Sequence, residues 1–318
     1  MRPCVLGWFG RQNGGDDRIA EVLTRRLSGC HPSFLPFTPL PPEVVNYFDA
    51  VVLTAGVWQP RNRLAREFHR WCRGVHVPIV ALGLGVEEVT PEMRAASAAL
   101  VERCDFLWVR DRESKRLLGD HPAIVVGPDV TWADPLPAAG EPRPGVVALN
   151  LRRWRRRPWR PEAWVDAARR SATAELRPWS FGPEDWIVLH DFFDPCPKAF
   201  DAAAGRDAEI VAGMRLHSLI FAAQMGVPAV GIAYDPKCRR FLAELERPQL
   251  ALDLDQADRL PQLVDGLRRR YAAEREHLAA IGRRFARRAD ELLAEGGRIL
   301  RRGGAARRPP DLAGRALT

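Results

Sequence analysis

The chain has 318 residues, of which 46% are hydrophobic and 28% are charged, proportions typical of soluble globular proteins. Its length favours two domains of roughly 150 residues each over a single domain. No apolar run approaches the roughly 20 residues that are needed to span a bilayer. Residues 4–9 read as a first strand rather than as part of a signal peptide. We therefore expect a cytoplasmic protein.

The net charge of +8 and the pI of 9.7 raise the question of a nucleic-acid partner. Lysine occurs only at positions 115, 198 and 237, so arginine carries nearly all of the positive charge. No nucleic-acid-binding module is recognisable, and we expect no nucleic-acid partner. Attraction of an anionic substrate, or peripheral association with an anionic membrane surface, explains the charge better.

The six cysteines are scattered along the chain and form no CxxC pair. This spacing argues against both a zinc site and a disulfide framework. We expect reduced, mostly buried thiols. The sequence also shows no metal-binding cluster, so no metal is expected.

Strands and helices alternate in the first half of the chain. The hydrophobic pattern predicts strands at 4–9, 48–53, 77–82, 106–109 and 124–126, and helices from about residue 16 and at 62–73 and 91–103. The turn after the first strand is rich in glycine and opens a helix, so Asn13, Gly15 and Asp16 allow close approach to a ligand. A simple turn with Asp16 as the helix N-cap is the alternative. The turn lacks the GxGxxG fingerprint, so we expect no NAD.

Arg110 follows the predicted strand 106–109 and opens the sequence Arg-Asp-Arg-Glu-Ser. Open α/β sheets bind ligands at the carboxyl edge of their strands, which is where Arg110 is expected. The alternative is structural, an Arg–Asp pair that holds the start of a helix. We favour that role for Asp111.

The second half begins after residues 136–145 (LPAAGEPRPG), which have the composition of a linker. Strands are then predicted at 146–151, 186–189, 210–212, 227–232 and 250–254, and helices at 161–170, from 218, from 236 and at 259–294. The tail from residue 301 lacks a core-forming pattern. The predicted division is therefore 1–140, 146–300 and a disordered basic tail at 301–318.

Arg152 stands at the end of the strand predicted at 146–151 and begins a run with six arginines in the nine residues 152–160. Trp154 and Trp159 are interleaved with these arginines. Such a run can bind an anionic acceptor or nucleic acid by charge and stacking. The simpler interpretation is a solvated basic loop, and we favour it for all but Arg152 or Arg153.

Two polar clusters occupy the stretch 210–245, where each strand is expected to end and a helix to begin. If residues 214–217 are extended, Arg215 and His217 project to the same side, beside the N–H groups of the next helix. Tyr234 and Lys237 follow the next strand. A guanidinium, an imidazole and helix-end amides suit a phosphate or carboxylate. Alternatively, Arg215 pairs with a carboxylate and His217 caps the helix.

The segment GMRLHSLIFAAQMGVPAVGIAYDPK (213–237) resembles the signature of the polysaccharide pyruvyl transferase family. The first turn (9–16), the Arg110 segment and the arginine after strand 146–151 also resemble this family. Two features depart from it: a single glycine stands at Gly56 where the family usually has several, and the segment 190–209 is shorter. The resemblance implies two doubly wound Rossmann-like α/β domains that face each other across a cleft, as in GT-B glycosyltransferases.

Members of this family transfer a pyruvyl group from phosphoenolpyruvate to a sugar, usually as a ketal that bridges two hydroxyls. The resemblance implies catalytic roles for His217 and Arg215. It implies substrate contacts from Arg110, Lys237, Tyr234, Arg152, Asn13, Gly15 and Asp16. We expect no cofactor beyond phosphoenolpyruvate as the donor substrate, and a sugar, glycan or lipid-linked glycan as the acceptor.

Two other functions stay open at this point. A nucleotide-sugar glycosyltransferase of the same architecture would use the arginine and lysine side chains to hold a diphosphate. A non-catalytic family member would explain the departures from the motifs.

Overall fold

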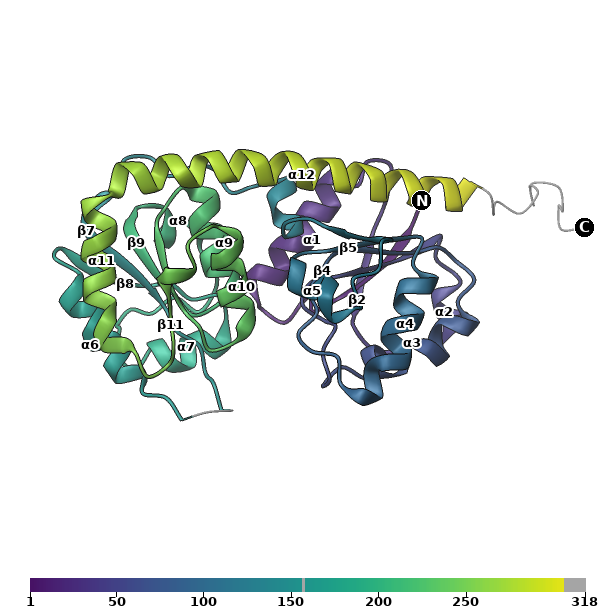
Figure 1. The fold of residues 1–318 in the computed structure, drawn as a ribbon, viewed down its shortest axis with the longest axis horizontal. Helices are drawn as coiled ribbons and strands as arrows, with labels where there is room; N and C mark the ends of the chain where they lie inside the picture. The colour runs from purple at the N-terminus through teal and green to yellow at the C-terminus, as the bar shows by residue number, and fades with distance from the viewer. Residues whose placement is uncertain (156–157, 306–318) are drawn as a thin grey trace, which may run out of the picture. The chain divides into compact units, whose positions relative to one another are not determined.

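The computed structural model describes residues 1–155 and 158–305, and they form two compact units (Figure 1). Among the described residues, unit 1 comprises Met1–Phe9, Ile19–Val130 and the chain from Arg288 onward, and unit 2 comprises Gly10–Arg18 and the chain from Thr131 to Arg287. Both units are therefore discontinuous in sequence, whereas the division expected from the sequence was continuous. Residues 156–157 of the arginine-rich run and 306–318 of the tail lie outside the described residues.

A parallel six-stranded sheet in the described residues forms the centre of unit 1, with the strand order β2-β1-β3-β4-β5-β6. Its strands are β1 (Pro3–Gly7), β2 (Ser33–Pro36), β3 (Ala50–Thr54), β4 (Ile79–Leu84), β5 (Phe106–Val109) and β6 (Ile124–Val126). Every residue of β3 and β4 is buried. Continuous apolar runs are expected for strands that are covered on both faces.

The helices of unit 1 are α1 (Gly14–Arg26, whose first turn belongs to unit 2), α2 (Pro42–Val45), α3 (Arg63–Trp71), α4 (Arg94–Arg103) and α5 (Arg112–Leu117), with the 3-10 turns η1 (Cys72–Gly74), η2 (Pro91–Met93) and η3 (Val130–Ala133, which continues into unit 2). Helices α3 and α4 pack against each other. Right-handed crossovers place α1 on the opposite face of the sheet from α3.

Unit 2 is built on a parallel five-stranded sheet in the described residues, with the order β11-β10-β9-β7-β8. Its strands are β7 (Arg143–Asn150), β8 (Glu175–Pro178), β9 (Ala208–Gly213), β10 (Ala229–Ile232) and β11 (Ala251–Leu252). Its helices and 3-10 turns are α6 (Pro161–Ser171), α7 (Pro183–Leu189), α8 (Ala202–Arg206), α9 (Leu216–Met225), α10 (Pro236–Glu244), η4 (Pro248–Leu250), η5 (Ala257–Arg259), α11 (Leu260–Arg269) and α12 (Tyr271–Ala305).

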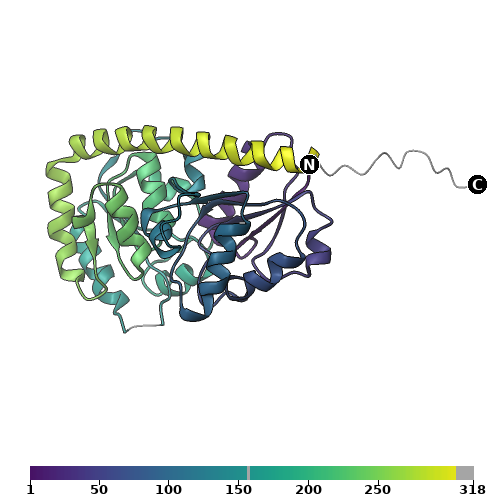
Figure 2. The same ribbon diagram turned by 45° about the vertical axis from the view of Figure 1, so that its right-hand side comes forward.

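Helices cover both faces of this second sheet. Figure 2 shows the same arrangement as Figure 1 from another side, with α6 and α11 together on one face and α8, α9 and α10 on the other. All ten residues of α9 are buried, and Gly226 ends this helix in the left-handed conformation with φ 73°. Helix α9 is thus a central element of the unit 2 core.

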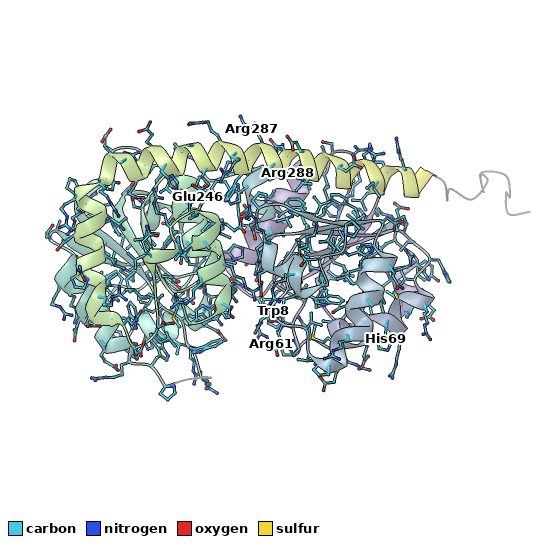
Figure 3. The ribbon with its side chains drawn as sticks, in the orientation of Figure 1. Trp8, Arg61, His69, Glu246, Arg287 and Arg288 are labelled. Carbon is cyan, nitrogen blue, oxygen red and sulfur yellow. The ribbon has the colours of Figure 1, made fainter. Side chains whose placement is uncertain are left out.

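Helix α12 contributes residues to both units. Its residues up to Arg287 belong to unit 2 and those from Arg288 onward to unit 1. Arg287 is exposed and points outward from the helix (Figure 3). Leu292, Leu293 and Leu300 are buried in unit 1.

Most predicted elements are present, and three predictions are wrong. The run at 186–189 is helix α7 rather than a strand, because Pro183 at the first helical position, followed by Glu184 and Asp185, starts a helix. Residues 216–217 are helical rather than extended, since α9 begins at Leu216.

The helical region predicted at 259–294 is confirmed, and it consists of two helices that separate at Arg270. The tail is helical up to Ala305 rather than disordered from residue 301. Strands β2 and β8 were not predicted.

The six cysteines are free, as expected, and four of them are buried. Within the described part of the chain, no helix combines the length and hydropathy that crossing a membrane requires.

Candidate functional site

The carboxyl edge of the second sheet has a topological switch point between β7 and β9. The chain moves from β7 to β8 on one side, then returns to β9 on the other side and continues to β10. Neighbouring strands whose connections diverge in this way leave a crevice at their carboxyl ends, where α/β proteins bind ligands. Asn150 ends β7 directly beside Gly213, which ends β9.

Arg215 follows β9 and forms a buried network at this switch point. Its Nε donates to both carboxylate oxygens of Asp185, at 2.6 and 2.8 Å, and its Nη2 lies 2.6 Å from Oδ1. The backbone N–H of Arg215 donates to the Asn150 Oδ1 at 2.8 Å, and the Asn150 Nδ2 donates to Asp185 at 2.8 Å. These hydrogen bonds connect Asn150, Asp185 and Arg215, which come from three separate parts of the chain.

Asp185 lies on the first turn of α7 and is fully buried. Burial raises the pKa of its carboxyl, while the charge of Arg215 and the donors from Phe181 and Asn150 act in the opposite direction. A neutral Asp185 would leave the Arg215 guanidinium buried without a counter-charge, which is strongly unfavourable. Loss of the charge of either partner would therefore destabilise this edge of the sheet. The alternative that Arg215 pairs with a carboxylate is the arrangement observed.

The first turn of α1 adjoins this network within unit 2. Arg215 Nη1 lies 3.4 Å from the Asn13 Oδ1, and the Asn13 side-chain amide donates to Asp16. The Asn13 carbonyl accepts from Asp17 at 2.9 Å, so α1 begins at Gly14, two residues before the predicted Asp16 N-cap.

His217 lies in the first turn of α9 and is 8% exposed. Its ring packs near Phe221, with centroids 5.6 Å apart. A Cβ atom on Gly15 would lie 2.0 Å from the imidazole Nδ1. Only glycine at position 15 therefore allows the imidazole its observed place beside α1.

Tyr234 follows β10, and two cations lie over its ring. Arg152 Cζ is 5.5 Å and Lys237 Nζ is 5.4 Å from the centroid of its ring, distances at which cations are attracted to an aromatic face. The Arg152 Nη1 also donates to the phenol oxygen at 3.3 Å. The Trp154 ring meets Tyr234 edge-on, with centroids 4.7 Å apart.

Carboxylates hold both of these cations. Asp235 caps α10 by accepting from the Lys237 N–H at 3.0 Å, and its Oδ2 lies 3.3 Å from the Lys237 Nζ. Glu184 pairs with Arg152. Glu184 directly precedes Asp185, so the first turn of α7 contacts both arginines of this edge.

Arg110 lies in unit 1, after β5. Its guanidinium has the carboxylates of Asp111 and Asp129 at 3.8 and 3.9 Å. A Cβ atom on Gly85 would lie 2.5 Å from the Arg110 Cζ. Asp111 also caps α5 by accepting from the Ser114 N–H at 2.6 Å, which is the structural role predicted for it.

The structure thus groups Asn13, Gly15 and Asp16 with Arg215 and His217. A second group in unit 2 contains Arg152, Tyr234 and Lys237. Arg110 lies in the other unit, and its contact with the substrate stays a prediction.

Three residues of this edge were missed from the sequence: Asn150, Glu184 and Asp185. Asn150 was included in a predicted strand, but nothing in that pattern reveals the partner of its side chain. For the two acids a signal existed, since a proline followed by two acidic residues is typical of a helix start. The apolar run 186–189 concealed that signal.

A family model described as polysaccharide pyruvyl transferase matches residues 13–236, which include every residue of both groups except Lys237. The chain belongs to the polysaccharide pyruvyl transferase family. It is therefore a transferase of this family. No curated protein matches the chain.

Solved structures with similar folds have low sequence identity to this member of the family. UDP-GlcNAc 2-epimerase from Neisseria meningitidis has 10% identity and a TM-score of 0.58, with 93% of this chain and 99% of that chain covered. Phytolacca americana UGT2 has 11% identity and a TM-score of 0.56, with 94% and 99% covered. Acinetobacter baumannii MurG has 13% identity and a TM-score of 0.51, with 95% and 99% covered. The predicted fold class of two Rossmann-like domains of the GT-B type is confirmed.

Proposed function

We propose that the protein transfers a pyruvyl group from phosphoenolpyruvate to hydroxyls of a sugar or glycan precursor and releases phosphate. One observation carries this proposal beyond family membership. In unit 2, Arg215 and His217 follow β9, and Lys237 follows β10. These strands are adjacent, so the three residues lie at the same carboxyl edge of the sheet. Arg152 joins them after β7.

Phosphoenolpyruvate has two anionic groups, a carboxylate and a phosphate, and both need cationic donors. The planar guanidinium of an arginine binds either group through two parallel hydrogen bonds. Arg215 and Arg152 supply such groups, and Lys237 adds a point charge. The start of α9 adds backbone N–H groups and the positive end of the helix dipole.

The reaction first requires a proton at the methylene carbon of the enol. Protonation leaves positive charge on C2, and an acceptor hydroxyl adds there and gives up its proton. A second hydroxyl then bonds to C2 as the C2–O bond to phosphate breaks, which yields the ketal and inorganic phosphate. Each step transfers a proton, and we assign an acid–base role to His217, because an imidazole can both donate and accept a proton near neutral pH.

The remaining predicted residues have supporting roles in this scheme. Gly15 leaves space for the imidazole, and Asn13 and Asp16 form the polar first turn of α1 beside it. The ring of Tyr234 contacts both Arg152 and Lys237. Arg110 is the substrate contact that we assign to unit 1. The scheme needs no metal and no cofactor.

Phosphate release measured with phosphoenolpyruvate and a panel of sugar, glycan and lipid-linked glycan acceptors tests the proposal. Acceptor-dependent release of phosphate, with saturable binding of phosphoenolpyruvate, is the expected result. Binding of a nucleotide sugar alone would instead identify a glycosyltransferase. A folded protein that binds neither donor would be a non-catalytic member of the family.

A vesicle-binding assay tests the expected membrane association separately. Co-sedimentation with vesicles that contain anionic phospholipid, but not with neutral vesicles, is the expected result.

A further inference from the structure

We propose that Asp185 is a positioning residue for donor binding, which fixes one edge of the Arg215 guanidinium and so directs the other edge to the substrate. This inference rests on the proposed function. The family resemblance did not point to Asp185, because the sequence around it was interpreted as a strand.

The two edges of the guanidinium have different partners. The carboxylate oxygens of Asp185 accept from Nε and Nη2 at 2.6–2.8 Å. The Nη1 lies 3.4 Å from the Asn13 amide oxygen, its only hydrogen-bond partner within residues 1–155 and 158–305. A contact of 3.4 Å is longer than the usual range for N–H···O bonds. A carboxylate or phosphate oxygen would be a stronger acceptor for that edge.

Asp185 is itself immobilised, which a positioning residue must be. Its Oδ2 accepts from the Phe181 N–H at 2.9 Å and from the Asn150 Nδ2 at 2.8 Å. Asn150 also accepts from the backbone N–H of Arg215 at 2.8 Å. The backbone N–H of Arg215 is thereby bound to Asn150 and its guanidinium to Asp185, and these two residues are hydrogen-bonded to each other. The long side chain loses its rotamer freedom on folding rather than on binding the donor, and such preorganisation strengthens binding.

The negative charge of Asp185 and its positioning role predict opposite effects of one substitution on the affinity for phosphoenolpyruvate. Asp185→Asn removes a negative charge beside Arg215, so by charge alone the affinity for an anion would increase. An amide cannot accept from both Nε and Nη2 while keeping its bonds to Phe181 and Asn150. The guanidinium would then lose its orientation, and the affinity would decrease. The sign of the change therefore separates the two effects.

The test measures the Kd of phosphoenolpyruvate by calorimetry, and kcat and KM by phosphate release, for wild type and Asp185→Asn. We expect Kd and KM to increase about tenfold or more, the size of one lost charged hydrogen bond, with a smaller change in kcat. An unchanged or decreased Kd would overturn the inference. Asp166→Asn, the same substitution at an exposed position of α6 that pairs with Arg169, is the matched control and should bind as wild type does.

A second variant keeps the test decisive if Asp185→Asn does not fold. Arg215→Lys keeps a positive charge next to Asp185 but lacks the second edge of the guanidinium. We expect its Kd to increase at least as much as that of Asp185→Asn. If Arg215→Lys binds phosphoenolpyruvate as wild type does, Arg215 is only the counter-ion of Asp185, and the inference is wrong. Failure of the wild type to bind phosphoenolpyruvate would contradict the proposed function instead.

Discussion

The carboxyl edges of the two sheets have similar architecture and different chemistry. Both sheets begin with the same strand order, in which the second strand lies beside the first and the third lies on its other side. In unit 1 the arginine of this edge, Arg110, is flanked by two carboxylates, those of Asp111 and Asp129. In unit 2, Arg215 has one carboxylate on one edge and a neutral amide on the other.

This difference shows that two edges of similar architecture can hold an arginine in different charge environments. Two carboxylates balance the charge of Arg110 inside its own unit. Arg215 keeps one edge directed to a neutral group, and His217 and the Tyr234 group lie in the same unit. The carboxyl edge of the unit 2 sheet is therefore the stronger candidate for the donor site. Substitutions in both units test this contrast.

The largest effect is expected at His217. His217→Gln should lower kcat by roughly 10²–10⁴-fold, because the imidazole is proposed to move protons. The Kd of phosphoenolpyruvate should change far less, since arginines supply most of the anion binding. Phosphate release at saturating donor measures the first quantity and calorimetry the second.

The control for His217 is His69→Gln on α3 of unit 1 (Figure 3), which should leave turnover unchanged. A folded His217→Gln protein with wild-type turnover would end the acid–base assignment. Loss of binding with normal turnover at saturation would instead make His217 a ligand contact.

A smaller effect is expected from Gly15→Ala. The added methyl group would lie 2.0 Å from the imidazole Nδ1, so the ring must move. Displacing a catalytic group by about 1 Å can lower the rate roughly 10²-fold, and kcat should decrease by that order while Kd changes little.

Gly85→Ala is the corresponding change in unit 1, where a Cβ atom would lie 2.5 Å from the Arg110 Cζ. Since Arg110 is predicted to bind rather than to react, this variant should raise KM without lowering kcat. A wild-type KM would remove Arg110 from the site.

Lys237→Met tests the point charge after β10. The affinity for phosphoenolpyruvate should weaken by about 1.5–3 kcal/mol, the range for a hydrogen bond to a charged group, and Lys237→Arg should retain part of it. Lys115→Met on α5 of unit 1, which removes a bond to the Ile124 carbonyl at 3.0 Å, is the control. Equal affinities for wild type and Lys237→Met would show that Lys237 does not contact the donor.

The smallest effect is expected at Glu175, at the amino end of β8 and away from the carboxyl edge. Hydrogen bonds from Arg177 lower the pKa of this carboxyl, and Arg143 contributes to the same shift. Because the pKa is lower in the folded state, the stabilisation is present above the ordinary pKa of glutamate and is lost as pH falls through the lowered value.

Glu175→Gln should therefore decrease the free energy of unfolding by only about 0.2–1 kcal/mol at pH 7. The difference from wild type should disappear in strong acid, and donor affinity should not change. Urea unfolding at several pH values measures the difference. If it grows toward low pH instead, the carboxylate of Glu175 does not stabilise the folded state through its arginine partners.

The strands of the core could be predicted closely because their signal is local. The predicted strands 106–109 and 124–126 match β5 and β6, since apolar residues between turns leave few alternatives. Strand β8 escaped prediction because its sequence, Glu-Leu-Arg-Pro, has little apolar character.

The candidate site was predicted in part, for a similar reason. Arg215 and His217 belong to one continuous motif and could be identified from the sequence. Asp185 is 30 positions away from Arg215, and the pairing of their side chains is set by the tertiary fold, which no local pattern encodes. Arg215 could therefore be predicted as a site residue, but the direction of its guanidinium could not.

Helix α12 has a consequence for the synthesis of the protein. Strands β1 to β6 of unit 1 precede the strands of unit 2 in the sequence, yet unit 1 also needs turns of α12 that follow them. A Cβ atom on Gly296 would lie 2.6 Å from Leu82, a Cβ on Gly127 would lie 2.2 Å from Leu292, and Arg26 pairs with Asp290 at 2.6 Å. Domains that are continuous in sequence can fold one after another during translation. In this chain unit 1 is completed only after the strands of unit 2 have been synthesised, and its sheet remains partly uncovered until α12 follows.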